Sequence, residues 1–172
     1  TGVQTCALPI CYYNEKYYEF DIHPYFVKVF KKRWYVVAYS PGTNDIRCYA
    51  LDRMENVIIS EEVFKMPKDL EPAEYFKDCF GIINNKDSEV QKVVLKVDAF
   101  QSNYIRNLPL HDSQKETKRT DEYSIFEYHL KPEFDFEQEI FSNMDTMEVL
   151  EPLWLRDEVT EKLRNLAEKY KI

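Results

Sequence analysis

Residues 23–53 read HPYFVKVFKKRWYVVAYSPGTNDIRCYALDR, and this stretch decides the fold of the first half of the chain. Two apolar runs, 25–30 and 34–39, are separated by three consecutive cations. Both runs are rich in valine and aromatic residues, which favour β-strands, so the pattern predicts a hairpin with a basic tip. Turn-forming residues at 41–45 predict a second turn, after which residues 46–51 form a third strand.

The charge of this stretch differs from that of the whole chain. Residues 23–53 contain six lysines and arginines against two aspartates, whereas the 172-residue chain has a formal net charge of −8. An acidic protein is not expected to bind nucleic acid through its bulk charge. A basic, aromatic-rich hairpin in such a chain predicts a local anion-binding site instead. The alternative is a solvated hairpin tip whose arginines form ordinary salt bridges.

The tripeptide Trp34-Tyr35-Val36 follows the basic turn, with Pro24 upstream and the sequence IRCYALDR at residues 46–53 downstream. This ordered set resembles the WYL-domain family, in which a Trp-Tyr-Leu signature precedes an Arg-x-Phe-Arg-Leu-Asp-Arg-Ile pattern. Two positions depart from the family, because Val36 replaces the leucine and Ala50 replaces an arginine. The resemblance implies a small SH3- or Sm-like β-barrel. It also implies a sensor of nucleotides or short nucleic acids, usually preceded by a winged-helix DNA-binding domain.

The composition argues against several other classes of protein. With three glycines, the chain contains neither a G-x-G-x-x-G motif nor a P-loop. Its apolar runs are far shorter than the roughly 18 residues that a membrane span needs, so we expect no membrane contact. The four cysteines, at positions 6, 11, 48 and 79, form no C-x-x-C pair. This spacing argues against a zinc site and favours reduced thiols in a cytoplasmic protein.

Motifs of catalytic sites are also missing from the sequence. There is no G-x-S-x-G and no H-E-x-x-H, and no cysteine lies in the sequence context of a nucleophile. We therefore predict that the protein is not an enzyme and that it uses no cofactor and no metal.

The first ten residues, TGVQTCALPI, carry no charge and resemble the translated read-through of a sequencing adapter. They lack both the basic region and the longer apolar core of a signal peptide. We therefore expect residues 1–11 to be non-native. We also expect the natural protein to have an N-terminal DNA-binding part that this chain lacks.

The rest of the sequence divides into two domains joined by a short helix and a linker. Residues 12–70 supply about five short strands, and such a sheet hides its apolar face only if it curls into a small barrel. An apolar pattern that starts with a proline predicts a helix over 72–80, and the polar residues 84–89 predict a linker. We assign 71–89 to this helix and linker and 90–172 to the second domain.

In the second domain, strands alternate with helices, so the whole chain is predicted to be α+β. Strands are expected near residues 93–97, 113–119, 123–130 and 147–150, and helices near 100–108 and after a capping Asp135. This β-α-β-β-α-β order is that of ferredoxin-like domains. A last amphipathic helix begins at Pro152. Residues 110–114 and 148–156 resemble the extension that commonly follows WYL domains.

Cations interleaved with aromatic rings suit a phosphodiester that carries bases. Guanidinium groups bind phosphate bidentately, and rings stack on bases. We predict Arg47 and Arg53 as phosphate donors and Tyr35 as a stacking or hydroxyl contact. Lys28 and His23 are predicted as supporting residues.

Three cations at the hairpin tip are predicted as additional basic contacts: Lys31, Lys32 and Arg33. Trp34 is predicted to be a core residue, because a tryptophan in a small barrel usually anchors packing. Arg53 follows Asp52 directly, so a structural ion pair between these two competes with ligand binding as the role of Arg53.

These observations predict the ligand-sensing part of a bacterial WYL-type transcriptional regulator. Its partner would be a nucleotide or a short single-stranded nucleic acid, and promoter DNA would be bound through the missing N-terminal part. We also expect a homodimer, formed through the sheet edge or the last helix of the second domain. The alternative is a protein-interaction module whose barrel binds no nucleic acid.

Overall fold

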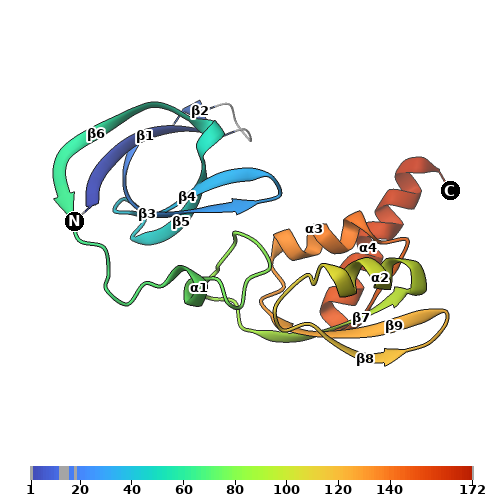
Figure 1. Cartoon of the computed structure of the whole chain (residues 1–172). Coiled ribbons are helices and arrows are strands. Elements are labelled where there is room, and N and C mark those ends of the chain that lie inside the picture. The colour runs from blue at the N-terminus through green and yellow to red at the C-terminus, as the bar shows by residue number, and fades with distance from the viewer. Residues whose placement is uncertain (1, 12–15, 18, 172) are drawn as a thin grey trace. The chain divides into compact units, whose positions relative to one another are not determined.

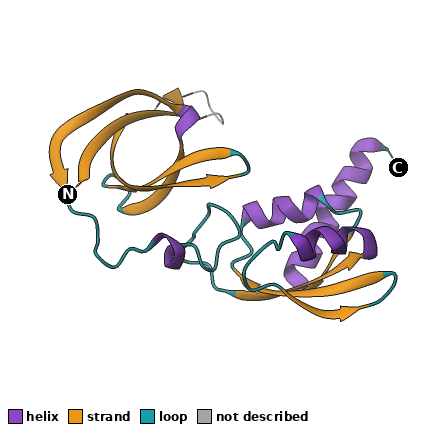
Figure 2. Ribbon diagram, viewed as in Figure 1, coloured by secondary structure: helices purple, strands orange, loops and turns teal. Residues whose placement is uncertain are grey.

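The structure of the chain, a computed structural model, describes residues 2–11, 16–17 and 19–171 (Figure 1). The chain divides into two compact units, residues 1–75 and residues 76–172. Each unit has its own antiparallel sheet together with at least one helix (Figure 2), which confirms the predicted α+β class. Among the described residues, no helix is long and apolar enough to cross a membrane.

The first unit consists mainly of β-strands. Its elements are β1 (Gly2–Cys11), β2 (Lys16–Tyr17), β3 (Phe20–Phe30), β4 (Arg33–Ser40), β5 (Asp45–Ala50), the 3-10 helix η1 (Leu51–Arg53), β6 (Met54–Phe64) and the short helix α1 (Pro72–Tyr75).

These strands form an antiparallel sheet in the order β5-β4-β3-β1-β6, with β2 also paired to β1. Figure 1 shows that the sheet curls around its own interior. Within the described part of the chain, no pairing joins β5 to β6, so the sheet stays open. The SH3- or Sm-like barrel predicted for residues 12–70 is therefore seen only as a curled, open sheet, in which β6 pairs with β1. The finer fold assignment stays a prediction.

Residues 2–11, which we expect to be non-native, form β1 between β3 and β6. Thr5, for example, pairs with Ile22 on one side and with Ile59 on the other. Strand pairing uses backbone groups that every non-proline residue carries, so a foreign segment can take this position as well as a native one. The origin of the segment therefore stays a prediction.

The predicted hairpin is formed by β3 and β4, and its turn is unusual. Phe30 pairs with Arg33, so Lys31 and Lys32 are the two central turn residues. Their φ angles are 45° and 64°. This left-handed conformation is the one that a type I′ turn requires, and it normally selects Asn-Gly because a Cβ atom there costs about 1–2 kcal/mol per residue. The hairpin thus carries two lysines at positions where they are conformationally unfavourable.

The buried interior of the first unit is small, as far as its side chains are described. Ile22, Val36 and Ala38 are buried against one another, and partly buried side chains of Phe20, Tyr49 and Met54 pack on them. The pair of Val29 and Trp34 lies two residues nearer the tip than the pair of Val27 and Val36, and its side chains are 52% and 56% exposed. The tip of the hairpin therefore extends beyond this core.

The second unit contains the predicted β-α-β-β-α-β order followed by a helix. Its elements are β7 (Gln91–Asp98), α2 (Ala99–Asn107), β8 (Lys115–Arg119), β9 (Tyr123–Leu130), α3 (Phe134–Ser142), β10 (Met147–Glu151) and α4 (Leu153–Tyr170). The sheet is antiparallel in the order β10-β7-β9-β8.

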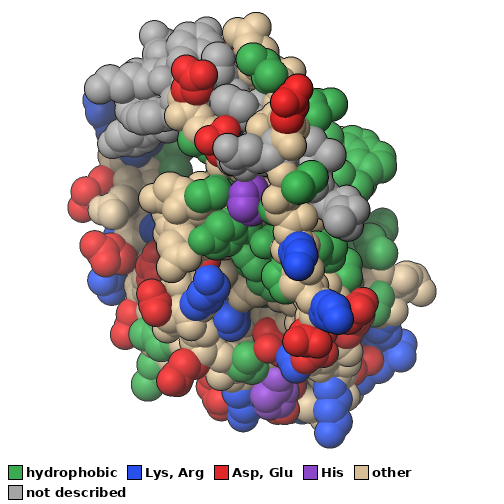
Figure 3. Space-filling view, turned by 90° about the vertical axis from the view of Figure 1, so that its left-hand side faces the viewer, with side chains coloured by type: hydrophobic (Ala, Val, Ile, Leu, Met, Phe, Trp, Pro, Cys, Tyr) green, Lys and Arg blue, Asp and Glu red, His purple; other side chains and the backbone are tan. Residues whose placement is uncertain are grey.

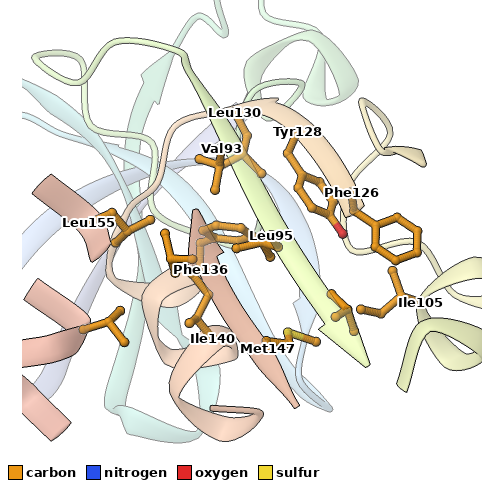
Figure 4. Close-up of a cluster of buried hydrophobic side chains, with 13 residues drawn as sticks. Val93, Leu95, Ile105, Phe126, Tyr128, Leu130, Phe136, Ile140, Met147 and Leu155 are labelled. Atoms are coloured by element: carbon orange, nitrogen blue, oxygen red, sulfur yellow. The ribbon is translucent and has the colours of Figure 1, made fainter. Parts of the chain in front are cut away.

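One face of this sheet carries the hydrophobic core of the second unit (Figure 4). Side chains of β7, β9 and β10 meet side chains of all three helices there, among them Phe126, Tyr128, Phe136 and Leu155, each of which is completely buried. The alternating burial along β9 follows from the two-residue period of a strand with one covered face.

The segment between the two sheets differs from the prediction. The helix predicted over 72–80 ends at Tyr75, and the residues after it belong to the second unit. Lys131 explains why: its backbone N–H donates to the Asp78 carbonyl at 2.8 Å. Its Nζ also donates to Asn84 Oδ1 at 3.0 Å and to the Asn85 carbonyl at 2.8 Å. The start of the predicted linker is therefore tied to the second unit.

Asp135 does not cap α3 as predicted, because the helix begins one residue earlier, after Glu133. The carboxylate of Asp135 is buried and accepts hydrogen bonds from the backbone N–H groups of Ile82 at 2.8 Å and Ile83 at 3.2 Å. Asp135 therefore fastens residues 82–83 to the second unit.

Candidate functional site

The cations of the hairpin tip lie around one pocket, with a volume of about 630 Å³. It is lined by Lys31, Lys32, Arg33, Trp34, Tyr35, Leu51 and Asp52. The last residue of β5, Ala50, pairs with Tyr35, and η1 follows immediately. This register brings Leu51 and Asp52 beside the tip and completes the pocket.

Trp34 is not a core residue, contrary to the prediction, because 56% of its surface is exposed. It pairs with Val29, which is 52% exposed. Both lie on the part of the hairpin that extends beyond the small core, where no other described element covers them. A tryptophan at the edge of a basic pocket can stack on an aromatic ligand.

Arg33 is oriented by an ion pair within the pocket. Its Nε lies 3.1 Å from Oδ2 of Asp52, and both side chains are about half exposed, at 40% and 53%. Asp52 thus pairs with Arg33, whereas the sequence had suggested an ion pair of Asp52 with Arg53 as one of two roles for that arginine. Lys31 lies nearby, with its Nζ 5.7 Å from the centre of the Phe30 ring.

The structure brings together Tyr35 and Lys28, both of which were predicted as site residues. They are directly opposite each other in the β3–β4 ladder, so their side chains project from the same face of the sheet. Lys28 is not among the residues that line the pocket, but it lies next to one that is.

The two arginines predicted as phosphate donors lie on different elements, Arg47 on β5 and Arg53 on η1. Arg47 pairs with Ala38, three residues along β4 from Tyr35, so Arg47 and Tyr35 project from opposite faces of the sheet. Arg53 is half-buried at the end of η1, next to the pocket residue Asp52. Neither arginine lines the tip pocket.

His23 belongs to a different cluster, at the other end of β3. Its ring stacks on Phe64 with a centroid distance of 4.6 Å and lies 5.5 Å from the ring of Tyr39. Burial raises the pKa of the neighbouring Tyr25, and the charge of Tyr39 adds to this effect. Lys28 is five positions after His23 in the sequence, which corresponds to about 16 Å along a strand. His23 therefore packs among aromatic rings and does not support the tip.

The described part of the chain contains no group of three or more histidine, cysteine or acidic side chains that could hold a metal ion. What the tip offers is a set of positive charges beside an exposed indole ring and a phenol. Cations beside such rings can bind an anion that carries an aromatic group. On the face of the molecule that Figure 3 shows, lysine and arginine side chains are interspersed with acidic ones, and hydrophobic side chains are exposed between them.

Sequence reasoning missed three members of the pocket: Trp34, Leu51 and Asp52. The length of the hairpin could have predicted that Trp34 is exposed. With a two-residue turn, Trp34 lies only two residues from the tip, where a small core does not cover it. That signal was outweighed by the usual preference of tryptophan for the interior.

Solved structures with a similar fold were found, although their sequences are distant. A CRISPR Cas-related protein matches with a TM-score of 0.58 and 12% identity, over 98% of this chain and 48% of that one. Proteasome accessory factor B/C (PafBC) of Arthrobacter aurescens matches with a TM-score of 0.42 and 16% identity, over 97% of this chain and 25% of that one. The chain therefore spans less than half the length of either protein. No curated protein matches the chain in sequence.

Family comparison identifies both units. Residues 3–59 match the WYL domain, and residues 89–167 match the WCX domain. The first match contains the hairpin, the tip pocket and most of β6, and the second contains the whole sheet of the second unit. The chain therefore contains a WYL domain followed by a WCX domain and belongs to the WYL-domain family.

Proposed function

We propose that the chain is the ligand-sensing part of a transcriptional regulator and that its WYL domain binds a nucleotide or a short single-stranded nucleic acid at the hairpin tip. The observation that carries this proposal is the tip pocket, where three cations, an exposed tryptophan and a tyrosine line one cavity. Phosphate groups would contact Lys31, Lys32 and Arg33, and a base would stack on Trp34.

The conformation of the turn supports a functional role for its charges. Lys31 and Lys32 both have positive φ angles, which asparagine and glycine adopt at lower cost. Unfavourable backbone conformations tend to occur where function requires a particular side chain. A need for positive charge at the tip would explain why lysine occupies these two positions despite the backbone cost.

The expected energies are sufficient for a sensor. Each stacked base contributes on the order of 1–3 kcal/mol, and a hydrogen bond to a charged group contributes about 1.5–3 kcal/mol. One stacked base and two or three such hydrogen bonds approach the roughly −8 kcal/mol that corresponds to micromolar binding.

Titration with a short single-stranded oligonucleotide at about 50 and 200 mM salt tests this proposal. Two to three phosphate contacts predict that affinity falls about tenfold between these salt concentrations. Arg33→Ala should weaken binding about tenfold or more, because it removes a charge-assisted contact and leaves Asp52 to repel the ligand. Arg47→Ala is the comparison variant. A larger loss in Arg47→Ala than in Arg33→Ala would place the site at the originally predicted arginines.

The remaining expectations form part of the same proposal. The protein acts in the cytoplasm as a homodimer, has no catalytic activity, and contacts promoter DNA through a part that precedes this chain. The strand order β10-β7-β9-β8 supports a ferredoxin-like class for the second unit.

A protein-interaction module is the second candidate, and one observation favours it. Strand β6 pairs only with β1 among the described strands, and Val57, Ile58, Ile59 and Val63 on it are between 51% and 74% exposed. An exposed apolar edge strand is a site where another strand can pair. The absence of oligonucleotide binding, together with a dimer that dissociates on dilution, would favour this function.

A further inference from the structure

We infer that the tip pocket recognises a terminal phosphate monoester with its attached base, rather than the internal phosphodiesters of a strand. The inference rests on the proposed function, because it assumes that the ligand is a nucleotide or nucleic acid. It specifies which part of that ligand the pocket binds.

The first argument is charge. Three cations and one carboxylate line the pocket, which leaves a formal charge of +2. A terminal phosphate carries about −1.5 to −2 at neutral pH, whereas an internal diester carries −1. The charge of the pocket therefore matches a single monoester, and one diester would leave part of it uncompensated.

The second argument is the arrangement of the cations. Lys31, Lys32 and Arg33 are consecutive, so their Cα atoms are about 3.8 Å apart along the chain, and all three line the same cavity. Proteins that follow a single strand distribute their cations along a groove. Here the three cations line one cavity at the end of a hairpin, which suits the recognition of one phosphate.

The third argument is the charge of the rest of the molecule. Two other pockets, both in the second unit, contain more acids than bases. One is lined by Asp98, Glu122, Asp145 and Glu148 with a single lysine, and the other by Asp87, Glu89 and Glu133 with no cation. With a net charge of −8, the chain as a whole repels a long polyanion, and a Debye length of about 8 Å limits the charges that act on a short ligand to those close to it.

Two sources can supply this chemistry, a mononucleotide and the phosphorylated end of a strand. In either source, the base next to the terminal phosphate would lie beside Trp34 and Leu51, which form the apolar side of the pocket. Asp52 lies at the same cavity and would accept hydrogen bonds from an amino or hydroxyl group of that nucleotide.

Two matched ligand pairs test the inference by calorimetric titration of the whole chain. The first pair is a deoxyadenosine tetranucleotide with and without a 5′-phosphate. The second is adenosine 5′-monophosphate and its 3′,5′-cyclic diester, which share base and sugar. We expect the monoester of at least one pair to bind about tenfold to a hundredfold more tightly than its partner, since it gains one or two charge-assisted hydrogen bonds. The pair that shows the preference identifies the source.

The double variant Lys31→Asn/Lys32→Gly should abolish this preference and should fold at least as stably as the wild type. Lys65→Ala/Lys68→Ala is the matched control, because it removes the same charge from exposed positions of the first unit outside the pocket. Equal affinity within both pairs would overturn the inference, and the proposed function would stand if the tip variant still weakened that binding. If none of the four ligands binds, both the inference and the proposed function are overturned.

Discussion

The core rings of the WCX domain and the tip tryptophan of the WYL domain differ sharply in burial. In the WCX domain, Phe126, Tyr128 and Phe136 are completely buried between the sheet and its helices. In the WYL domain, Trp34 is 56% exposed at the end of a hairpin, although it is the largest side chain of that strand. Buried aromatic area stabilises a fold, whereas exposed aromatic area is available to a partner.

Under the proposed function, this difference amounts to a division of labour between stability and recognition. The buried cluster of the WCX domain includes thirteen residues, while that of the WYL domain, among the side chains described, includes three, with Val37, Ala50 and Phe64 buried outside it. Each unit has its own sheet and its own core, so a substitution in one need not disturb the other. The strongest tests are therefore paired substitutions, one in each unit.

The largest expected effect is the loss of a buried ring from the WCX core. Phe126→Ala should lower the free energy of unfolding by about 3–5 kcal/mol, because it removes apolar burial and leaves a cavity. Trp34→Ala should change stability by less than about 1 kcal/mol and should weaken ligand binding, since it removes the stacking surface. Urea unfolding and oligonucleotide titration of both variants measure the two quantities. A loss of more than about 2 kcal/mol in Trp34→Ala would contradict the division of labour.

The next largest effect is expected at Asp135, which joins the segment after α1 to the WCX domain. Asp135→Ala should cost about 2–3 kcal/mol, because the N–H groups of Ile82 and Ile83 lose a charged acceptor. Asp135→Asn is the matched control, since it keeps an acceptor oxygen and should recover part of the loss. Hydrogen exchange of the two amides should speed up in the alanine variant. Unchanged exchange would show that other contacts hold the segment.

The strand pattern could be predicted because it depends on local sequence. The two-residue alternation in β9, the apolar runs of β3 and β4 and the order of elements in the WCX domain all follow from side-chain periodicity. Asp135 shows the limit of such reasoning. A carboxylate near a helix start resembles a cap, but its partners here lie more than fifty residues earlier in the chain.

The candidate site was predicted only in part, for a related reason. The cations of the tip were recognised, but Arg47 and Tyr35 proved to be on opposite faces because their relation depends on the β4–β5 register. The exposure of Trp34 depends on where the core ends, which residue types alone do not determine. Tertiary register and the extent of the core are therefore the parts that the sequence left open.

The turn of the hairpin should show that recognition opposes stability in the WYL domain. Lys31→Asn/Lys32→Gly places the preferred residues at two positions with positive φ, and it should raise the free energy of unfolding by about 1–2 kcal/mol. The same variant should lose ligand affinity. Urea unfolding checks the first expectation. A destabilised variant would mean that the lysine side chains make contacts worth more than the backbone cost.

The smallest effects are expected for two ion pairs that differ in exposure. The pair of Arg106 and Glu116 in the WCX domain has side chains 22% and 24% exposed, with Nη2 of Arg106 2.7 Å from Oε1 of Glu116. Hydrogen bonds from Arg106 lower the pKa of Glu116 from 4.5 to about 2. The pair of Arg33 and Asp52 in the WYL domain is 40% and 53% exposed.

Because the pKa of Glu116 is lower in the folded state, its contribution to stability is present above about pH 4.5 and is lost as the pH falls toward 2. Glu116→Gln should therefore destabilise the protein by about 1 kcal/mol at pH 7, and the difference from wild type should shrink through that window.

Asp52→Asn should change stability by less than about 0.5 kcal/mol, since exposed pairs contribute little. It should nevertheless strengthen binding of anions at the tip, because it removes the one carboxylate of the pocket. If Asp52→Asn were the more destabilising of the two, the tip would have a structural role that its exposure does not indicate.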